Sequence, residues 1–426
     1  MKKMIMLLLA VSMLFSIMAC GGKKAEDSTG GTEDFTETGT EDTTIRFVHF
    51  RSEDAAVYQK LNEMFEEQNP GIKVEMSVES ADQTEYYAVL KTKLQGNANT
   101  VDVYAVHPGF YLNTMVEGGY AIDFAGTAAA DHYYPDFLET CRVGEGIYGL
   151  PQTYNAYVIF YNKDIFDKYS LKAPSSWEEM KQVCTVLQEN GEGTISSGFG
   201  ENWVYDLQIN GLLSSYYGGD PYVLQKLESG ELLWTDPGVV AAYTDLQQMG
   251  KDGFFINGAS GTAYEASIAL FAQGRAAMLN TGSWSVGGVL EADKDFNMGF
   301  FILPNSKNEY YLIQDVGQAL TINAKSEKQE ATMKYVEFLS NPEVTKIYAD
   351  ATVQTSTVQG VDSSSKENNE LNDLISQYTS IRAASVFFET PEFGNLYLEM
   401  SARAFNGEDV QALMEEAQAA MDTLQK

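Results

Sequence analysis

The sequence predicts an α/β protein with a large buried core. Strand and helix patterns alternate over residues 45–106. The last strand, residues 101–106, is a nearly continuous apolar run, which is typical of strands buried in a parallel sheet, and we expect Asp102 within it to be a structural carboxylate bonded to backbone. The chain has 426 residues, of which 44% are hydrophobic and 12% aromatic, so we expect two domains.

The alternation can be followed from the first strand. After residue 54, the apolar residues Val57, Leu61 and Phe65 recur at helical spacing, and a Pro-Gly pair ends the helix. Ligand loops of an α/β lobe lie at the carboxyl ends of its strands, which here are residues 49–52 and 107–109. In chain order we expect a strand at 45–49, a helix at 54–68, a strand at 72–78, a helix at 86–94 and a strand at 101–106.

Later segments continue the mixture of strand and helix. Ser176 is placed to cap a helix beginning at Trp177, and Glu179 three residues on completes a capping box. Helical periodicity dominates from there to about residue 250. The other expected elements are strands at 157–161, 298–303 and 318–322 and helices at 330–339 and 410–425.

The first twenty residues predict secretion. Two lysines precede an apolar run, residues 4–19, that is too short for a comfortable transmembrane span and stops at Cys20. Residues 17–20 resemble a bacterial lipobox, which implies that Cys20 is lipidated and becomes the mature N-terminus. We therefore expect residues 1–19 to be a lipoprotein signal peptide and the protein to be anchored to the cell membrane, facing the extracellular side.

The segment after the anchor predicts a flexible linker. It is built mainly from Gly, Ser, Thr, Asp, Glu and Lys, with Phe35 as its single aromatic residue. Such a composition cannot bury enough apolar surface to fold. Residues 20–43 are therefore expected to be the lipidated N-terminus and a disordered linker.

The charge of the chain excludes several classes of partner. The formal net charge at pH 7 is -32, and it becomes -34 once the two lysines of the signal are removed. A surface this acidic repels nucleic acid and anionic lipid head groups. We expect no nucleic-acid partner and no membrane contact other than the anchor.

Cysteine and histidine usage gives little sign of metal chemistry. Cys141 and Cys184 are the cysteines left after Cys20, and the sequence leaves open whether they form a disulfide. The three histidines show neither HExxH nor Cys-His spacing, so we expect no metal site and no cofactor.

Four stretches in order along the chain resemble one known family. The first runs from Gly-Ile-Tyr-Gly-Leu-Pro at 146–151, through residues 159–166, to Pro-Ser-Ser-Trp-Glu-Glu-Met at 174–180. The other three are residues 269–284, 324–339 and 407–417. Together they are similar to the extracellular solute-binding proteins of ABC importers, in the family of oligosaccharide-binding proteins that includes the maltose-binding protein.

This resemblance implies a two-lobed α/β periplasmic-binding-protein-like fold with a hinge and an interlobe ligand cleft. The chain would cross between lobes near residues 152–154 and again near Asp315. The implied role is a monomeric, non-catalytic receptor that binds a sugar or oligosaccharide and delivers it to the transmembrane subunits of an ABC permease. The implied division gives residues 44–153 and 314–362 to lobe 1, and residues 154–313 and 363–426 to a helix-rich lobe 2.

Tryptophan is the scarcest residue type that suits a sugar site, because sugars offer apolar ring faces for stacking. Trp177 lies in the first turn of a capped helix and Trp234 precedes an Asp-Pro pair, and both positions look structural in the family. The resemblance implies that Trp284 stacks on a sugar ring. It places Trp203 in a loop that also reaches the cleft.

Polar candidates come from loop position and from the resemblance. Sugar-binding relatives often place a hydrogen-bonding side chain at the position of Asn155, and Asp315 is suited to accept sugar hydroxyls. Each has a structural alternative, Asn155 as a turn residue and Asp315 as a cap of the following strand. The remaining candidates are Arg51 and Glu53 after the first strand, His107 after the third, and Phe393 and Asn395 near one end of the cleft.

Two other functions remain open from the sequence. The same receptor would suit a peptide or a polyamine, because the acidic surface is compatible with a cation. An anchored glycoside hydrolase is less favoured: paired carboxylates in an aromatic cleft also describe glycosidases, but no nucleophile elbow, phosphate loop or metal motif accompanies them.

Overall fold

The computed structural model describes residues 43–79, 83–96, 100–361, 363–383 and 390–425. The chain divides into two units, residues 1–41 and 42–426, and the described residues all belong to the second. The predicted signal peptide, the lipidation site Cys20 and the linker up to residue 42 lie outside the described residues.

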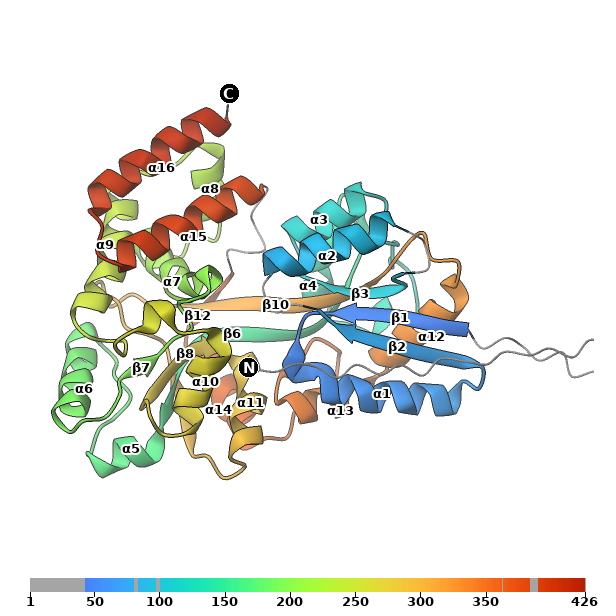
Figure 1. Ribbon diagram of the computed structural model, residues 1–426, viewed down its shortest axis with the longest axis horizontal. Helices are drawn as coiled ribbons and strands as arrows, with labels where there is room; N and C mark the ends of the chain where they lie inside the picture. The colour runs from blue at the N-terminus through green and yellow to red at the C-terminus, as the bar shows by residue number, and fades with distance from the viewer. Residues whose placement is uncertain (1–42, 80–82, 97–99, 362, 384–389, 426) are drawn as a thin grey trace, which may run out of the picture. The chain divides into compact units, whose positions relative to one another are not determined.

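The described chain mixes strands and helices throughout (Figure 1). The strands are β1 (Thr43–His49), β2 (Ile72–Val78), β3 (Val103–Val106), β4 (Arg142–Val143), β5 (Gly146–Ile147), β6 (Leu150–Asn162), β7 (Ile195–Ser196), β8 (Met278–Gly282), β9 (Met298–Phe301), β10 (Tyr311–Ile322), β11 (Thr355–Ser356) and β12 (Thr379–Arg382). The helices are α1 (Ala55–Gln68), α2 (Gln83–Gln95), α3 (Phe110–Glu117), α4 (Pro135–Leu138), α5 (Lys163–Lys168), α6 (Trp177–Glu189), α7 (Asp206–Tyr216), α8 (Val223–Ser229), α9 (Pro237–Lys251), α10 (Tyr264–Ala272), α11 (Val286–Ala292), α12 (Gln329–Ser340), α13 (Pro342–Thr352), α14 (Lys366–Ile375), α15 (Pro391–Phe405) and α16 (Val410–Leu424).

One twisted sheet organises these elements, in the strand order β2-β1-β3-β10-β6-β8-β7. β1 pairs in parallel with both β2 and β3, as expected for strands joined by helical crossovers. Figure 1 shows α2 and α3 on one side of these strands and α1, α12 and α13 on the other. Covering both faces explains why β3 is buried at every residue.

The antiparallel pair β6 and β10 runs through the middle of the sheet (Figure 1). β10 pairs with β3 near its end and with β12 near its start, while β6 pairs with β8 and β9 through its second half. The ladder between β6 and β10 is interrupted around Gln318, where the register shifts. The two strands therefore belong to both halves of the sheet at once.

Buried apolar side chains form separate clusters on either half of this sheet. One cluster draws on residues 45–150 and 319–361. A second draws on residues 157–313 and 381–421, and a smaller third one lies across β6 from it. The second and third clusters lie on opposite faces of β6, because alternate side chains of a strand point to opposite sides of the sheet. Tyr157 and Ile159 belong to the second cluster, while Val158 and Phe160 belong to the third. The lobe boundaries predicted from the sequence stay a prediction.

Most of the expected elements are present. The helices expected at 54–68 and 330–339 and the strand at 72–78 agree with α1, α12 and β2 to within a residue. The strands expected at 157–161 and 318–322 are each only the apolar portion of a much longer strand, β6 or β10. Polar residues such as Gln152, Asn155 and Asp315 interrupt the apolar pattern in the remainder.

The cap of α6 confirms half of the expected capping box. The Ser176 side chain accepts a hydrogen bond from the Glu179 backbone N–H. The Glu179 carboxylate, however, accepts from the backbone N–H and hydroxyl of Ser175 rather than from the backbone of Ser176. Contacts among Ser175, Ser176 and Glu179 therefore fix the start of the helix.

Asp102 is structural, as expected. Its carboxylate accepts the backbone N–H of Arg46 and forms an ion pair with Lys328 at 2.8 Å, which ties β1 to the start of α12. Cys141 and Cys184, whose pairing the sequence left open, are both buried free thiols in different hydrophobic clusters.

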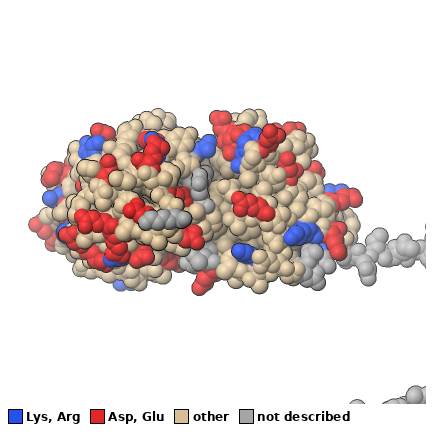
Figure 2. All heavy atoms as spheres, turned by 90° about the horizontal axis from the view of Figure 1, so that it is seen from above, with Lys and Arg blue, Asp and Glu red and all other residues tan. Residues whose placement is uncertain are grey.

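The surface carries the acidity of the sequence. Figure 2 shows acidic side chains spread over the face that it displays, with lysine and arginine only at isolated points. Within the described ranges, no helix combines the length and the apolar character that crossing a membrane requires.

Candidate functional site

A pocket of about 140 Å³ lies at the point where β6 and β10 meet the loops after β1 and β3. From the β1 and β3 side it is lined by Phe50, Arg51, Glu53 and His107. Tyr157 of β6, with Asp315 and Gly317 of β10, contributes from the central strands. The opposite side is formed by Glu201, Trp203, Asp206, Tyr264, Glu265, Trp284 and Leu398.

Two indole rings form the principal apolar wall. The ring centroids of Trp203 and Trp284 are 6.4 Å apart, and the planes are inclined by 47°. Tyr157 meets Trp284 edge-on at 5.8 Å, which fixes the indole from one side. The rings thus form a continuous aromatic surface along one side of the pocket.

Both indole N–H groups are already hydrogen-bonded to the protein. Nε1 of Trp284 donates to Oη of Tyr264 at 2.5 Å, and Nε1 of Trp203 donates to Glu201 at 2.9 Å. The Tyr264 hydroxyl is held in turn by Thr281 and Ser285. Because the polar edges of the indoles are occupied, the tryptophans contribute to the pocket through their apolar ring surfaces.

A glycine makes room for Trp284. A Cβ atom at Gly282 would lie 1.9 Å from the Cζ3 atom of the Trp284 ring. The backbone of Gly282, at the end of β8, is extended with φ -117°, so the requirement concerns space and not backbone conformation. The ring packs directly over this residue.

An ion-paired network lies behind the pocket. Arg51 is 6% exposed; its Nε atom lies 2.7 Å from an oxygen of the fully buried Asp54, and its Nη2 atom lies 3.3 Å from Glu53. Gln318 and Tyr348 also donate hydrogen bonds to Asp54. These bonds connect the loop after β1 to β10 and α13, so the only arginine of the lining is held firmly in place.

His107 presents a neutral ring. Burial, together with the charge of Arg51, lowers its pKa to about 3. The Tyr87 hydroxyl accepts a hydrogen bond from the His107 backbone N–H at 2.7 Å and lies 2.8 Å from Nδ1 of the ring. We therefore infer that the Tyr87 O–H donates to Nδ1, which is unprotonated. The ring then carries its own proton on Nε2, and Phe50 stacks on it at 4.5 Å.

Three carboxyl groups of the pocket have raised pKa values: burial and the charges of Glu53 and Glu201 raise that of Glu265, and the other two are aspartates. Burial raises the pKa of Asp206 to about 6, although the hydroxyls of Tyr397 and Tyr157 donate to it. Burial and the neighbouring charge of Asp206 raise the pKa of Asp315 to about 7, with Arg51 acting in the opposite direction. Asp315 is therefore about half ionised at neutral pH, and Asp206 is half ionised about one pH unit lower.

The structure brings together six of the nine residues predicted to bind ligand: Arg51, Glu53, His107, Trp203, Trp284 and Asp315. Asn155 is buried behind the lining and lies opposite Asp315 in the ladder between β6 and β10. Its side chain packs against Gly317, where an added Cβ atom would lie 2.6 Å from Nδ2 of Asn155. Phe393 does not fit the predicted role, since it is fully buried and packs on Trp234. Asn395 lies on an exposed position of α15 outside the lining.

Sequence reasoning missed several lining residues. Glu201 and Asp206 flank Trp203 in the sequence, so their proximity to a candidate residue was a usable signal. Tyr264 and Glu265 begin α10 with no distinguishing motif. Their role depends on α10 packing beside β8, which a local pattern does not reveal.

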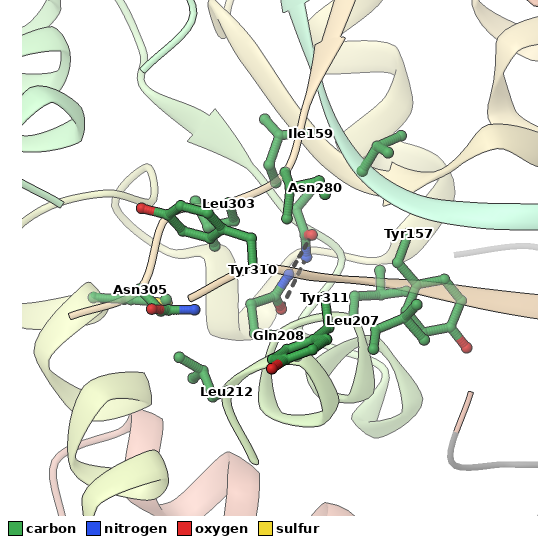
Figure 3. A pocket seen from close by; sticks show the side chains of 15 residues that line it. Tyr157, Ile159, Leu207, Gln208, Leu212, Asn280, Leu303, Asn305, Tyr310 and Tyr311 are labelled. Carbon is green, nitrogen blue, oxygen red and sulfur yellow. Dashed lines mark hydrogen bonds between the residues drawn. The ribbon is translucent and has the colours of Figure 1, made fainter. Parts of the chain in front are cut away.

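A second, smaller pocket lies beside α7 (Figure 3). Figure 3 shows the amide groups of Gln208 and Asn280 meeting in its interior, where each donates to the other. Its volume is about 40 Å³ and its walls are mainly apolar. Apart from Tyr157, which lines both, it shares no residue with the larger pocket and contains none of the predicted site residues.

Neither pocket offers metal chemistry. Among the residues that the structure describes, no three His, Cys, Asp or Glu side chains are grouped so as to hold a metal ion. The larger pocket instead combines aromatic faces with hydrogen-bonding groups, which is how binding sites for polar organic molecules are built.

The fold is that of the periplasmic binding proteins. The structure matches a solved structure of the solute-binding protein RafE in complex with raffinose, with a TM-score of 0.77 and 22% sequence identity over 90% of this chain and 100% of that one. The expected α/β fold class is thereby confirmed.

The chain belongs to the bacterial extracellular solute-binding proteins, since residues 50–346 match that family. It is 25% identical over 325 residues to the multiple sugar-binding protein of Streptococcus mutans, covering 75% of this chain and 76% of the relative. An ABC transporter extracellular-binding protein of Pyrococcus horikoshii is 26% identical over 255 residues, 59% of this chain and 58% of the relative. Because the family consists of solute receptors, the prediction that the protein is not an enzyme is confirmed.

Replacing Gly282 by Ala should displace Trp284, because the added methyl group would overlap the indole ring. We expect an altered near-ultraviolet circular dichroism spectrum and at least tenfold weaker binding of whichever sugar is identified as a ligand. Gly288→Ala is the matched control, since a Cβ atom there meets nothing within 4 Å. An unchanged spectrum and affinity in Gly282→Ala would show that the ring position does not depend on this glycine.

The stability of the unliganded protein should depend on the ionisation of Asp315. Its pKa is raised from 3.8 to about 7 by folding, so the native state binds more protons than the unfolded state between these values and stability falls as pH rises through them. Asp315→Asn should therefore raise the melting temperature at pH 8 and have little effect at pH 4. Melting curves at both pH values test this, and an equal effect at both would contradict it.

Proposed function

We propose that the protein is the membrane-anchored, substrate-binding component of an ABC importer and captures a sugar or oligosaccharide in the aromatic pocket. Family membership and the likeness to a multiple sugar-binding protein and to raffinose-bound RafE support this proposal. The observation that carries it is the pair of indole faces whose polar edges are bonded to Tyr264 and Glu201. Apolar faces beside carboxylates match the alternation of ring faces and hydroxyls on a sugar.

The pocket is placed to couple ligand capture to movement. Its walls come from both halves of the sheet, and β6 and β10 run between these halves. We infer that the predicted lobes, 44–153 with 314–362 and 154–313 with 363–426, close around the ligand by bending at these strands and at the C-terminal crossing. A closed, ligand-bound monomer would then be the form recognised by the permease.

The proposed anchor is Cys20. The lipobox-like residues before it and the polar segment after it support a lipoprotein held at the outer face of the cell membrane. Cys20→Ala should lose incorporation of a fatty-acid analogue during metabolic labelling and release the protein from the membrane fraction. Equal labelling of variant and wild type would refute lipidation at this residue.

A cationic ligand is the second candidate. Five carboxylate side chains line the pocket against one guanidinium, which favours positive charge in the ligand. This charge is also compatible with a polyamine or with a peptide amine, so the ligand panel must contain these compounds as well as sugars.

Trp284→Ala tests the sugar proposal most directly. Loss of the stacking face should weaken binding by roughly 1.5 to 3 kcal/mol, or about tenfold to a hundredfold in dissociation constant. A thermal-shift screen over neutral and amino sugars identifies the ligand, and titration calorimetry then compares wild type, Trp284→Ala and the control Trp177→Phe. Trp177 packs away from the pocket and bonds to Asp252.

A melting curve of each unliganded variant separates binding from folding. If Trp284 acted only in the core, its truncation would cost roughly 3 to 5 kcal/mol of stability. A large drop in melting temperature with near-normal affinity would reject the stacking role. Failure of every sugar in the screen to bind would reject the proposed function.

A further inference from the structure

The aromatic pocket carries an excess of negative charge. The lining contains the carboxylates of Glu53, Glu201, Asp206, Glu265 and Asp315. The only guanidinium of the lining, that of Arg51, is already paired with Asp54 behind the pocket and with Glu53. Since the His107 ring is neutral, no cation of the lining is left to balance the remaining carboxylates.

These carboxylates differ in how many hydrogen bonds they accept from the protein. Glu201 accepts from Trp203 and from the backbone N–H of Tyr264, and Asp206 accepts from two tyrosine hydroxyls. Among the described residues, no hydrogen bond or ion pair reaches the carboxylate of Asp315. A carboxylate in a partly buried position without a donor is costly, and a bound ligand is one way to relieve that cost.

The aromatic wall lines the same pocket as this carboxylate. Tyr157, which lines the pocket with Asp315, meets Trp284 at 5.8 Å, and Trp203 follows at 6.4 Å from Trp284. The faces of indole rings attract cations through their quadrupole, and tryptophan does so most strongly. Aromatic faces and a carboxylate without a donor, combined in one cavity, suit an ammonium group on an otherwise polar molecule.

We propose that the ligand is an amino sugar, a mono- or oligosaccharide that carries a free, protonated amine directed at Asp315. This inference rests on the proposed function, because it specifies the class of sugar for the same pocket. The amine donates to Asp315 and supplies the missing positive charge, while a sugar ring covers the Trp284 face. A neutral hydroxyl would offer the hydrogen bond without the charge, and an N-acetyl group would offer neither the charge nor the same small size.

The test uses matched sugars that differ only at this nitrogen. Titration calorimetry of the wild-type protein at pH 7 compares glucosamine, N-acetylglucosamine and glucose, then galactosamine with its two counterparts, then the β-1,4 disaccharides of the glucosamine series. We expect the amine to bind about tenfold to a hundredfold more tightly than its neutral partners in at least one series. Putrescine and spermidine serve as amines without a sugar ring.

The pH dependence should follow the carboxylates. At pH 5 the amine remains charged, whereas Asp315 and Asp206 are largely protonated, because their pKa values are raised to about 7 and about 6. Glu53, Glu201 and Glu265 also face the cavity, with Arg51 as the one charged base of the lining. The amine should therefore bind more weakly at pH 5 than at pH 7, while the neutral partners should change little.

Variants assign the effect to Asp315. Asp315→Asn should abolish the preference for the amine while the neutral sugar keeps its affinity. Asp245→Asn is the matched control, because Asp245 is also a buried carboxyl but bonds to Tyr216 and Ser306 outside the pocket. Asp245→Asn should keep the preference for the amine.

The outcomes separate this inference from the proposed function. Neutral sugars that bind as tightly as their amines would overturn the inference and leave a sugar receptor intact. Polyamines that bind while every sugar fails would overturn both. A preference for the amine that survives in Asp315→Asn would overturn the assignment of the ammonium to this carboxylate.

Discussion

The antiparallel pair of β6 and β10 is the constraint on which the site depends. Each strand is buried along most of its length and pairs with strands of both halves of the sheet. Strand pairing fixes which residues lie opposite one another, so Asn155 and Asp315 face each other across the ladder. The shift in register between Asp315 and Gln318 includes Gly317, which forms part of the pocket wall.

Polar bonds then hold the apolar parts of the pocket. The Tyr264 hydroxyl accepts from Trp284 and is held by Thr281 and Ser285, while Glu201 joins the backbone of Tyr264 to the indole of Trp203. Each ring therefore has a fixed edge and an available face. A rigid aromatic surface loses little conformational entropy when a ligand covers it, which favours tight binding by a small contact area.

The fold could largely be predicted from the sequence, because local periodicity reports burial and burial follows strand and helix geometry. The parallel strands and α1 are examples. The full lengths of β6 and β10 could not be predicted, since polar residues interrupt the apolar pattern of both strands.

The sequence led to residues of the candidate pocket where one residue type was both scarce and suited to sugar binding. Of the four tryptophans, the family resemblance singled out Trp203 and Trp284, and the structure places both in the lining of the pocket. Phe393 lies in the core and not in the lining of the pocket, and the sequence could not show this, because an aromatic residue near a helix start gives the same local pattern in either place. Tyr264 was missed because its importance comes from contacts across the fold.

The carboxyl groups of the pocket have opposite effects on the stability of the unliganded protein and on the proposed ligand binding. Folding moves Asp206 and Asp315 out of water, which raises the pKa of both, and the charge of Asp206 raises the pKa of Asp315 further. Ionisation of these groups therefore destabilises the unliganded protein. Arg51 gives limited relief, because Asp54 and Glu53 already engage it. A ligand that donates to Asp315 recovers the cost only when it is bound. Under this proposal, the same carboxylate destabilises the empty protein and stabilises its complex with ligand.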